Sequence, residues 1–208
     1  DPIMPRAFDW RRAWMSHKGS LPHLRQEGVV YFVTFRLADS LPAEVMKRLR
    51  AKRDAWLASH PPPLTEEQIQ EYRRIWTARI EKLLDSGHGE CVLRDPACRK
   101  PVEATLRHDD GKAYLLGRFA IMPNHVHALL QLLADSDLSN TLQAWKSISA
   151  RQINTYLRRS GSLWQDESFD HIVRDDAAMN RLTKYIEDNP RCLPVGSYTV
   201  GTGLLQAQ

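Results

Sequence analysis

Two histidines of this chain have the type and spacing that suit a metal site. His125 and His127 are separated by one residue and follow Met122-Pro123-Asn124, whose Pro and Asn predict a turn between two apolar strands. Side chains alternate between the faces of a strand, so both imidazoles are expected on one face. Two imidazoles on a rigid hairpin can bind one divalent metal ion, although such a pair alone is more often a hydrogen-bonded structural feature.

A second pair of polar residues lies near the end of the last predicted helix. Tyr185 and Asn189 are four residues apart and therefore share a helical face. Asn189 precedes Pro190, which places it in the last turn, where its carboxamide oxygen could be a third metal ligand beside the phenol. Oxygen ligands of this kind suit Mg²⁺ or Mn²⁺. Taken alone, Tyr185 is more typical of a helical core residue than of a nucleophile.

The apolar and capping patterns predict the elements that position these residues. Strands are expected over the following segments: 29–37, 113–121, the stretch that begins at His125, and 169–173. Helices are expected over 42–58, 65–84, 95–107, 139–159 and 177–188. We expect Ser139 to cap the fourth of these helices and Asp175 or Asp176 to cap the last.

This order of elements predicts a single α+β domain over residues 1–208. Mostly antiparallel strands with helices on one face give a ferredoxin-like sandwich, and the 42% of hydrophobic residues suffice for its core. The two helices within 41–89 form a helical insertion after the first strand. The tail 191–208 carries Pro, Gly and Thr and is predicted to be irregular.

Positive charge is concentrated in the first quarter of the chain. The formal net charge is only +4, but residues 6–53 hold 11 Lys and Arg against 4 Asp and Glu. A polyanionic partner and solvated helix faces explain this excess equally well. The Trp and Arg residues of 8–14 would suit stacking on bases of single-stranded nucleic acid, and a tail that packs its tryptophans on the body of the protein explains them equally well. The candidate DNA-binding residues are Arg11, Arg12, Arg36, Lys146, Arg151 and Arg174.

Cysteine usage and hydropathy indicate where the protein works. Cys91, Cys98 and Cys192 lack the spacing of a zinc knuckle or a disulfide framework, so free thiols are expected. We find neither an apolar run long enough to span a membrane nor a signal peptide. We therefore expect a cytoplasmic protein that does not bind membranes.

The motifs together resemble those of a known family. Met122-Pro123-Asn124-His125-Val126-His127, followed by Tyr185-Ile186-Glu187-Asp188-Asn189-Pro190, resembles the REP-associated tyrosine transposases. These are single-tyrosine HUH endonucleases among the insertion-sequence-200-like transposases. The resemblance covers roughly residues 20–190, and its other motifs are residues 31–37, Lys146-Ser147, Ile153-Asn154, Trp164-Gln165 and residues 169–175.

The resemblance implies a site and a reaction. It implies that His125, His127 and Asn189 bind one Mg²⁺ or Mn²⁺ and that Tyr185 is the nucleophile. It also implies that single-stranded hairpin DNA is cut through a 5′-phosphotyrosine intermediate and rejoined without ATP. We favour a monomer, although some relatives complete each site with a partner's tyrosine helix, and the interval 161–171 permits either arrangement.

Two other functions fit parts of the sequence. In the first, the chain is a metal-dependent phosphodiesterase or hydrolase in which the histidine-bound metal activates water and Tyr185 is structural. In the second, the chain binds hairpin DNA without turnover. We find neither a Walker-type phosphate loop nor an evident cluster of three acidic residues of the kind that two-metal transposases use.

Overall fold

The structure is a computed structural model. It describes residues 14–16, 23–26, 28–61, 64, 65, 67, 68, 71, 72, 75, 80, 82–84 and 86–205. The predicted DNA-binding residues Arg11 and Arg12 lie outside the described residues. Within the described part of the chain, no helix is long and apolar enough to cross a membrane.

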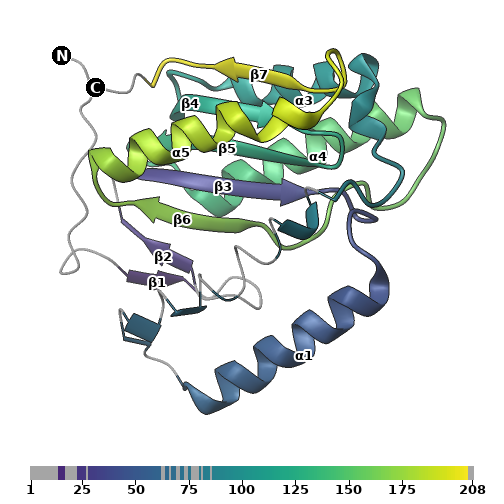
Figure 1. The fold of residues 1–208 in the computed structure, drawn as a ribbon. Coiled ribbons are helices and arrows are strands. Elements are labelled where there is room, and N and C mark those ends of the chain that lie inside the picture. Colours follow the sequence, from purple (N-terminus) through teal and green to yellow (C-terminus); the bar gives the residue numbers. More distant parts are fainter. Residues whose placement is uncertain are drawn as a thin grey trace.

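A five-stranded antiparallel sheet organises the chain, in the order β6-β3-β5-β4-β7 (Figure 1). Its strands are β3 (Val30–Arg36), β4 (Tyr114–Ile121), β5 (His125–Leu132), β6 (Phe169–Val173) and β7 (Thr199–Thr202). A separate pair, β1 (Trp14–Ser16) and β2 (His23–Arg25), forms a small second sheet.

The helices are α1 (Ala43–Ser59), α3 (Pro96–His108), α4 (Leu138–Tyr156) and α5 (Asp176–Asp188), with the short 3-10 helices η1 (Val92–Arg94) and η2 (Asn189–Cys192). The order β3, α3, β4, β5, α4, β6 is the ferredoxin-like order of elements. The predicted α+β fold with an antiparallel sheet is therefore confirmed.

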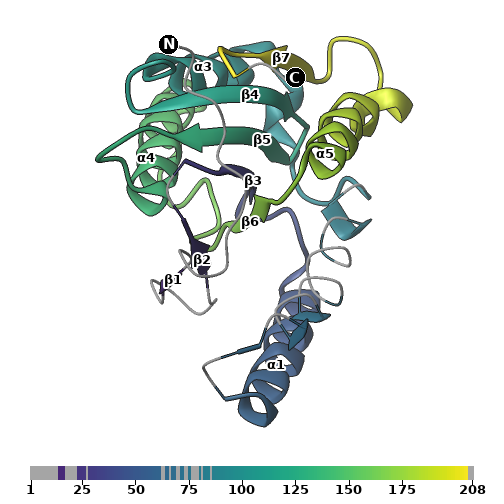
Figure 2. The same ribbon diagram turned by 90° about the vertical axis from the view of Figure 1, so that its left-hand side faces the viewer.

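Helices cover both faces of the sheet, which differs from the prediction. Helices α3 and α4 lie together on one face, and α5 lies on the other (Figure 2). The prediction of helices on one face is met only by α3 and α4, which connect strands within the sheet. The second face is apolar at positions such as Val30, Phe32 and Leu129, so it also requires a cover, and α5 supplies it with Leu182 and Ile186.

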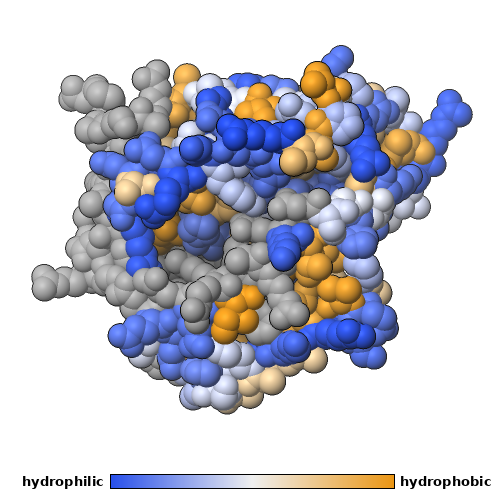
Figure 3. Space-filling model, viewed as in Figure 1, coloured by the Kyte–Doolittle hydropathy of each residue, from blue (hydrophilic) through white to orange (hydrophobic). Residues whose placement is uncertain are grey.

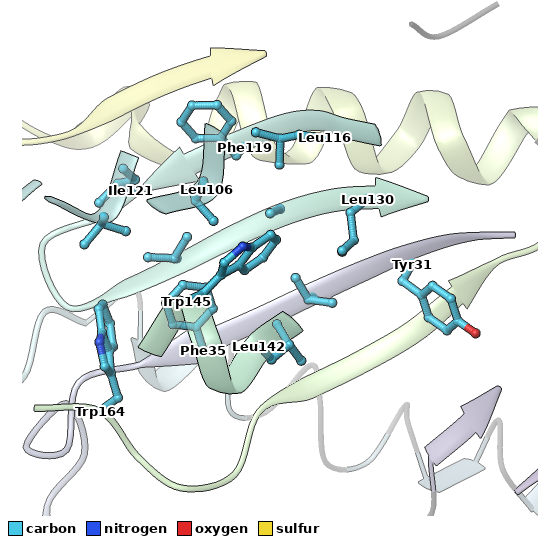
Figure 4. Close-up of a cluster of buried hydrophobic side chains, with 14 of the residues drawn as sticks. Tyr31, Phe35, Leu106, Leu116, Phe119, Ile121, Leu130, Leu142, Trp145 and Trp164 are labelled. Atoms are coloured by element: carbon cyan, nitrogen blue, oxygen red, sulfur yellow. The ribbon is translucent and has the colours of Figure 1, made fainter. Parts of the chain in front are cut away.

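The main core lies between the sheet and the helices α3 and α4. Figure 4 shows Trp145 of α4 beside Phe35 of β3. The indole Nε1–H of Trp145 donates to Tyr114 Oη at 2.9 Å, and Tyr114 Oη donates to the Leu106 carbonyl at 2.8 Å. The buried polar atoms of these aromatic residues are thus satisfied, which lets them pack within the core without an unpaired donor.

Side-chain caps start α3 and α5 at the predicted places, whereas α4 is capped by another residue than predicted. Asp95 accepts a hydrogen bond from the Ala97 backbone N–H, and Asp175 accepts one from that of Ala178. The predicted cap Ser139 is wrong, because α4 begins one residue earlier, at Leu138, and is capped by Asp137. A carboxylate two residues upstream of Ser139 satisfies the first-turn donors, and a charge at this position also complements the helix dipole.

The helical insertion follows β3 as predicted and has a small core of its own. Leu41, Met46 and Leu49 pack with Tyr72, Ile80 and Leu84. The residues described from Glu67 to Leu84 are helical, which agrees with the second predicted helix as far as it is described. In Figure 3, hydrophobic residues gather between α1 and the body of the protein, whereas the outer side of α5 is largely hydrophilic.

The described part of the C-terminal tail, residues 191–205, contains strand β7, in contrast to the predicted irregular segment. Strand β7 pairs with β4 at the edge of the sheet. Arg99 of α3, which is only 6% exposed, secures the segment before it. Its guanidinium donates to the carbonyls of Leu93, Arg94 and Gly196 and to Thr199 Oγ1. The composition of the tail did not reveal this strand because its pairing and its anchor come from residues far away in sequence.

We expect Arg99→Ala to destabilise the protein. The change removes hydrogen bonds from a buried cation to three carbonyls, so the free energy of unfolding should fall by about 2–4 kcal/mol. Urea denaturation measures this value. Arg151→Ala, at an exposed position of α4, is the control and should change it by less than about 0.5 kcal/mol. Equal stability of the two variants would contradict the anchoring role of Arg99.

Candidate active site

The two histidines lie side by side in the middle of the sheet. Strand β5 runs between β3 and β4, and Thr34 and Arg36 of β3 are the direct partners of His127 and His125. The alternate residues Val126, Ala128 and Leu130 enter the main core. Both imidazoles therefore project toward the face that α5 covers, and they are 1% and 0% exposed.

Each imidazole is oriented by a hydrogen bond to its Nδ1 atom. His125 Nδ1 lies 2.8 Å from Asn124 Oδ1, and His127 Nδ1 lies 2.8 Å from Thr34 Oγ1. The two Nε2 atoms face each other at 3.1 Å. Both Nδ1 atoms are thus occupied by protein partners, and both Nε2 atoms converge on one point.

Burial keeps both histidines neutral. The loss of hydration lowers the pKa of His125 to about 3. Burial, and after it the proximity of His125, lowers the pKa of His127 well below its ordinary value. At neutral pH the pair therefore carries no proton that would have to leave before a metal ion binds.

Helix α5 brings the tyrosine to the histidines. The ring centroids of Tyr185 and His127 are 5.3 Å apart in an edge-on arrangement. Phe32 of β3 stacks on the His127 ring at a centroid distance of 5.3 Å and meets the Tyr185 ring edge-on at 6.1 Å. The predicted nucleophile and one predicted metal ligand, 58 positions apart in the sequence, are thus neighbours in the fold.

Packing and charge hold α5 in this position. Leu182 and Ile186 join the apolar cluster on this face of the sheet. On the same helix, Glu187 forms an ion pair with Arg118 of β4. The helix passes directly into η2 at Asn189 and Pro190, so the last turn that carries Asn189 continues into a second short helix instead of fraying.

The residues present fit a divalent metal ion. Two ligands bound to one ion at about 2.1 Å and at roughly a right angle lie about 3 Å apart, which is close to the separation of the two Nε2 atoms. Asn189 Oδ1 is buried and has no hydrogen-bond partner among the described residues. Nor do those residues contain a cluster of three His, Cys, Asp or Glu side chains that could hold a metal. The third ligand that the motif resemblance implies, Asn189, offers an amide oxygen of the kind that Mg²⁺ and Mn²⁺ accept.

The predicted DNA-binding residues lie at different distances from this site. Arg36 is adjacent to His125 but is only 1% exposed. Its Nη2 atom lies 3.2 Å from Met46 Sδ, whereas its Nε and Nη1 atoms have no hydrogen-bond partner among the described residues. Burial lowers the pKa of its guanidinium to about 10. Arg174 directly follows β6 and is half-buried. Lys146 donates to the carbonyls of Gln165 and Asp166, and Arg151 is exposed on the same helix α4, behind the sheet.

The sequence analysis did not identify Asn124, Thr34 or Phe32 as part of the site. Asn124 was assigned only to the turn, and Thr34 and Phe32 only to a buried strand. The alternation of β3 could have placed Phe32, Thr34 and Arg36 on one face, but not opposite the histidines. That assignment requires the register between β3 and β5, which the sequence does not state.

Residues 99–189 match the model of the protein family described as "Transposase IS200 like". This segment contains most of α3 and all of β4, β5, α4, β6 and α5, and therefore His125, His127, Tyr185 and Asn189. The segment is thus similar to the IS200-like transposase family, which is the family that the histidine and tyrosine motifs predicted. This match supports a transposase-type function on DNA.

Among solved structures, one similar chain is described as "Structure of the REP associates tyrosine transposase bound to a REP hairpin". It shares 14% sequence identity with this chain, the alignment covers 79% of this chain and 68% of that chain, and the TM-score is 0.37. A similarity of this size does not establish a common fold or function. No curated protein matches the chain at a significant level.

The buried histidines predict how stability depends on pH. Because the folded-state pKa values lie below the unfolded value of about 6.5, the unfolded chain binds protons first as the pH falls. In chelator-treated protein, the free energy of unfolding should fall by about 1 kcal/mol per histidine between pH 7 and pH 5.5. Urea denaturation at both pH values measures this loss.

The control is the double variant His125→Asn, His127→Asn. Its free energy of unfolding should change less than that of the wild type over the same pH interval, because neither replacement titrates there. An equally steep fall in both proteins would show that other groups cause the pH dependence.

Proposed function

We propose that the protein is a metal-dependent single-stranded DNA endonuclease and strand transferase that acts through Tyr185. The observation that carries the proposal is the convergence of the His125 and His127 Nε2 atoms at 3.1 Å, with the ring of Tyr185 beside them. This arrangement lies within the segment that matches the IS200-like transposase model. A structural tyrosine would not need two neutral imidazoles with converging Nε2 atoms next to it.

In the proposed reaction, Tyr185 Oη attacks the phosphorus of a phosphodiester in the DNA strand. The phenolic proton leaves, a bond forms between Oη and phosphorus, and the bond from phosphorus to O3′ breaks. The 3′ oxygen takes up a proton, so the products are a 5′-phosphotyrosine and a free 3′-OH. A 3′-OH of another strand can reverse the step, which joins DNA without a high-energy cofactor.

The residues around Tyr185 prepare this step. His125, His127 and Asn189 would hold a divalent ion, Mg²⁺ or Mn²⁺, which when bound supplies Lewis acidity at the phosphate. Phe32 and the apolar cluster under Tyr185 exclude water from one side of the phenol. Water would otherwise compete as the nucleophile and turn the transferase into a hydrolase.

We propose hairpin-forming single-stranded DNA as the substrate. Support comes from the motif resemblance and from the basic first quarter of the chain, in which residues 6–53 hold 11 Lys and Arg. Among the predicted DNA contacts, Arg36 lies directly opposite His125 in the sheet. We also propose a monomer, because α5 packs against strands β4 and β5 of its own chain.

The first test detects covalent attachment. The protein is incubated with a labelled library of single-stranded hairpins and Mn²⁺ and then denatured, and the DNA that remains attached to protein is measured. Attachment should require the metal and should vanish in Tyr185→Phe, which lacks only the attacking oxygen. Tyr198→Phe is the matched control, because Tyr198 lies outside the site, and it should retain attachment. Cleavage without attachment, unchanged in Tyr185→Phe, would instead favour the hydrolase, and binding without cleavage a DNA-binding protein.

The second test concerns the histidines. His127→Ala removes one converging Nε2 atom and should reduce cleavage at 0.1 mM Mn²⁺ by about 100-fold or more, an effect of the size expected for loss of a metal ligand or of the charge stabilisation that the metal supplies. The control is His108→Ala, which removes an exposed imidazole at the end of α3 and should leave cleavage unchanged. Full activity of His127→Ala at low metal would disprove the ligand assignment.

A further inference from the structure

Asn124 connects the site to the helical insertion. Its side chain is 1% exposed and makes three hydrogen bonds. The amide nitrogen Nδ2 donates to the carbonyls of Leu84, at 3.3 Å, and His88, at 3.0 Å, at the end of the insertion. The amide oxygen Oδ1 lies 2.8 Å from His125 Nδ1. One buried side chain thus contacts both a predicted metal ligand and the insertion.

The chemistry of these partners fixes the orientation of the amide. The carbonyl oxygens of Leu84 and His88 can only accept hydrogen bonds, so they must face the NH₂ group of Asn124 and not its oxygen. The oxygen then faces His125. Because an amide oxygen also only accepts, His125 must carry its proton on Nδ1. Its Nε2 atom is therefore left with a free lone pair, which is the form that binds a metal ion.

His127 is not constrained in the same way. Its Nδ1 partner is the hydroxyl of Thr34, at 2.8 Å, and a hydroxyl can either donate or accept. Without metal, Nε2–H of His127 can donate to His125 Nε2, which is 3.1 Å away. For His127 Nε2 to bind a metal ion, the ring proton must move from Nε2 to Nδ1. The Thr34 hydroxyl must then turn so that its oxygen accepts a hydrogen bond from Nδ1–H. The number of protons on the His127 ring stays the same.

We propose that Asn124 is a positioning residue that holds His125 in the Nδ1–H form. The end of the helical insertion, through the carbonyls of Leu84 and His88, holds Asn124 in turn. The insertion thereby sets the metal affinity of the site. The metal part of this inference rests on the proposed function, whereas the proton position does not. A shift of the last turn of the insertion would break the hydrogen bonds to the Asn124 amide, so the insertion can change metal binding at the histidines.

The end of the insertion packs closely against Asp39, the residue shortly after β3. The backbone N–H of Glu90 donates to Asp39 Oδ2 at 2.7 Å. Gly89 has φ +90°, and a Cβ atom added there would lie 2.7 Å from the Asp39 carbonyl oxygen. A side chain at position 89 must therefore displace this segment, next to the His88 carbonyl that holds Asn124.

The first experiment reads the proton position directly. Long-range ¹H–¹⁵N NMR spectra of metal-free protein, in which the imidazoles are ¹⁵N-labelled, distinguish Nδ1–H from Nε2–H histidines. Wild-type His125 should be in the Nδ1–H form. Asn124→Ala should give a mixture of both forms. A merely structural Asn124 would leave the His125 signal unchanged in both proteins, which would overturn the proposal.

The second experiment tests the insertion from a distance. Calorimetric titration with Mn²⁺, without DNA, should give a dissociation constant about 10- to 100-fold weaker in Asn124→Ala, the size of effect that outer-shell partners of metal-bound histidines have. Gly89→Ala should weaken binding by about tenfold. The matched control is Gly161→Ala, at φ +97°, where an added Cβ meets no atom within 4 Å and only the backbone strain is the same.

The outcomes separate this inference from the proposed function. A wild-type protein that does not bind Mn²⁺ would refute the metal-dependent function, and the NMR experiment would still decide the role of Asn124. A wild-type protein that binds Mn²⁺, together with Asn124→Ala and Gly89→Ala variants that bind equally well, would refute the inference alone. Thermal unfolding of each variant establishes that it is folded, and Gly89→Ala tests the link even if the Asn124→Ala variant does not fold.

Discussion

The burial of two imidazoles at the centre of the sheet is the constraint on which the rest of the structure depends. Strand β5 has hydrogen-bonded neighbours on both sides, so His125 and His127 cannot reach solvent at an edge. They are neutral, and each needs a polar partner for Nδ1. Thr34 comes from the neighbouring strand and Asn124 from the turn. The register between β3 and β5 and the shape of the hairpin turn therefore place the hydrogen-bond partners of the two histidines.

Helix α5, the end of the insertion and the segment after α5 all contribute to the face that carries the histidines. Helix α5 covers it and brings Tyr185 to His127, while the ion pair of Glu187 with Arg118 ties the helix to β4. The end of the insertion reaches the other side of the histidines through Asn124. Strand β7 and Arg99 fix the segment that follows the last turn of α5. A rigid sheet thus supports a site built from segments far apart in sequence.

Local patterns were sufficient for most elements. The β-branched and aromatic run of β3, the Pro-Asn turn before β5 and the caps Asp95 and Asp175 each act within a few residues, so the sequence predicts them directly. Predictions failed where a distant partner decides. The tail forms β7 because β4 offers an edge and Arg99 offers donors, and α5 lies apart from α3 and α4 because the second face of the sheet is also apolar.

The sequence by itself determined which chemical groups are available. It set the two histidines on one face of a strand and Tyr185 and Asn189 on one face of a helix, because both pairings follow from the fixed periods of regular backbone. Only the tertiary structure decided that these faces meet, that Phe32 contacts both His127 and Tyr185, and that Asn124 joins His125 to the insertion. Such contacts depend on strand register and helix packing, which arise from the whole core and leave no signal in any single segment.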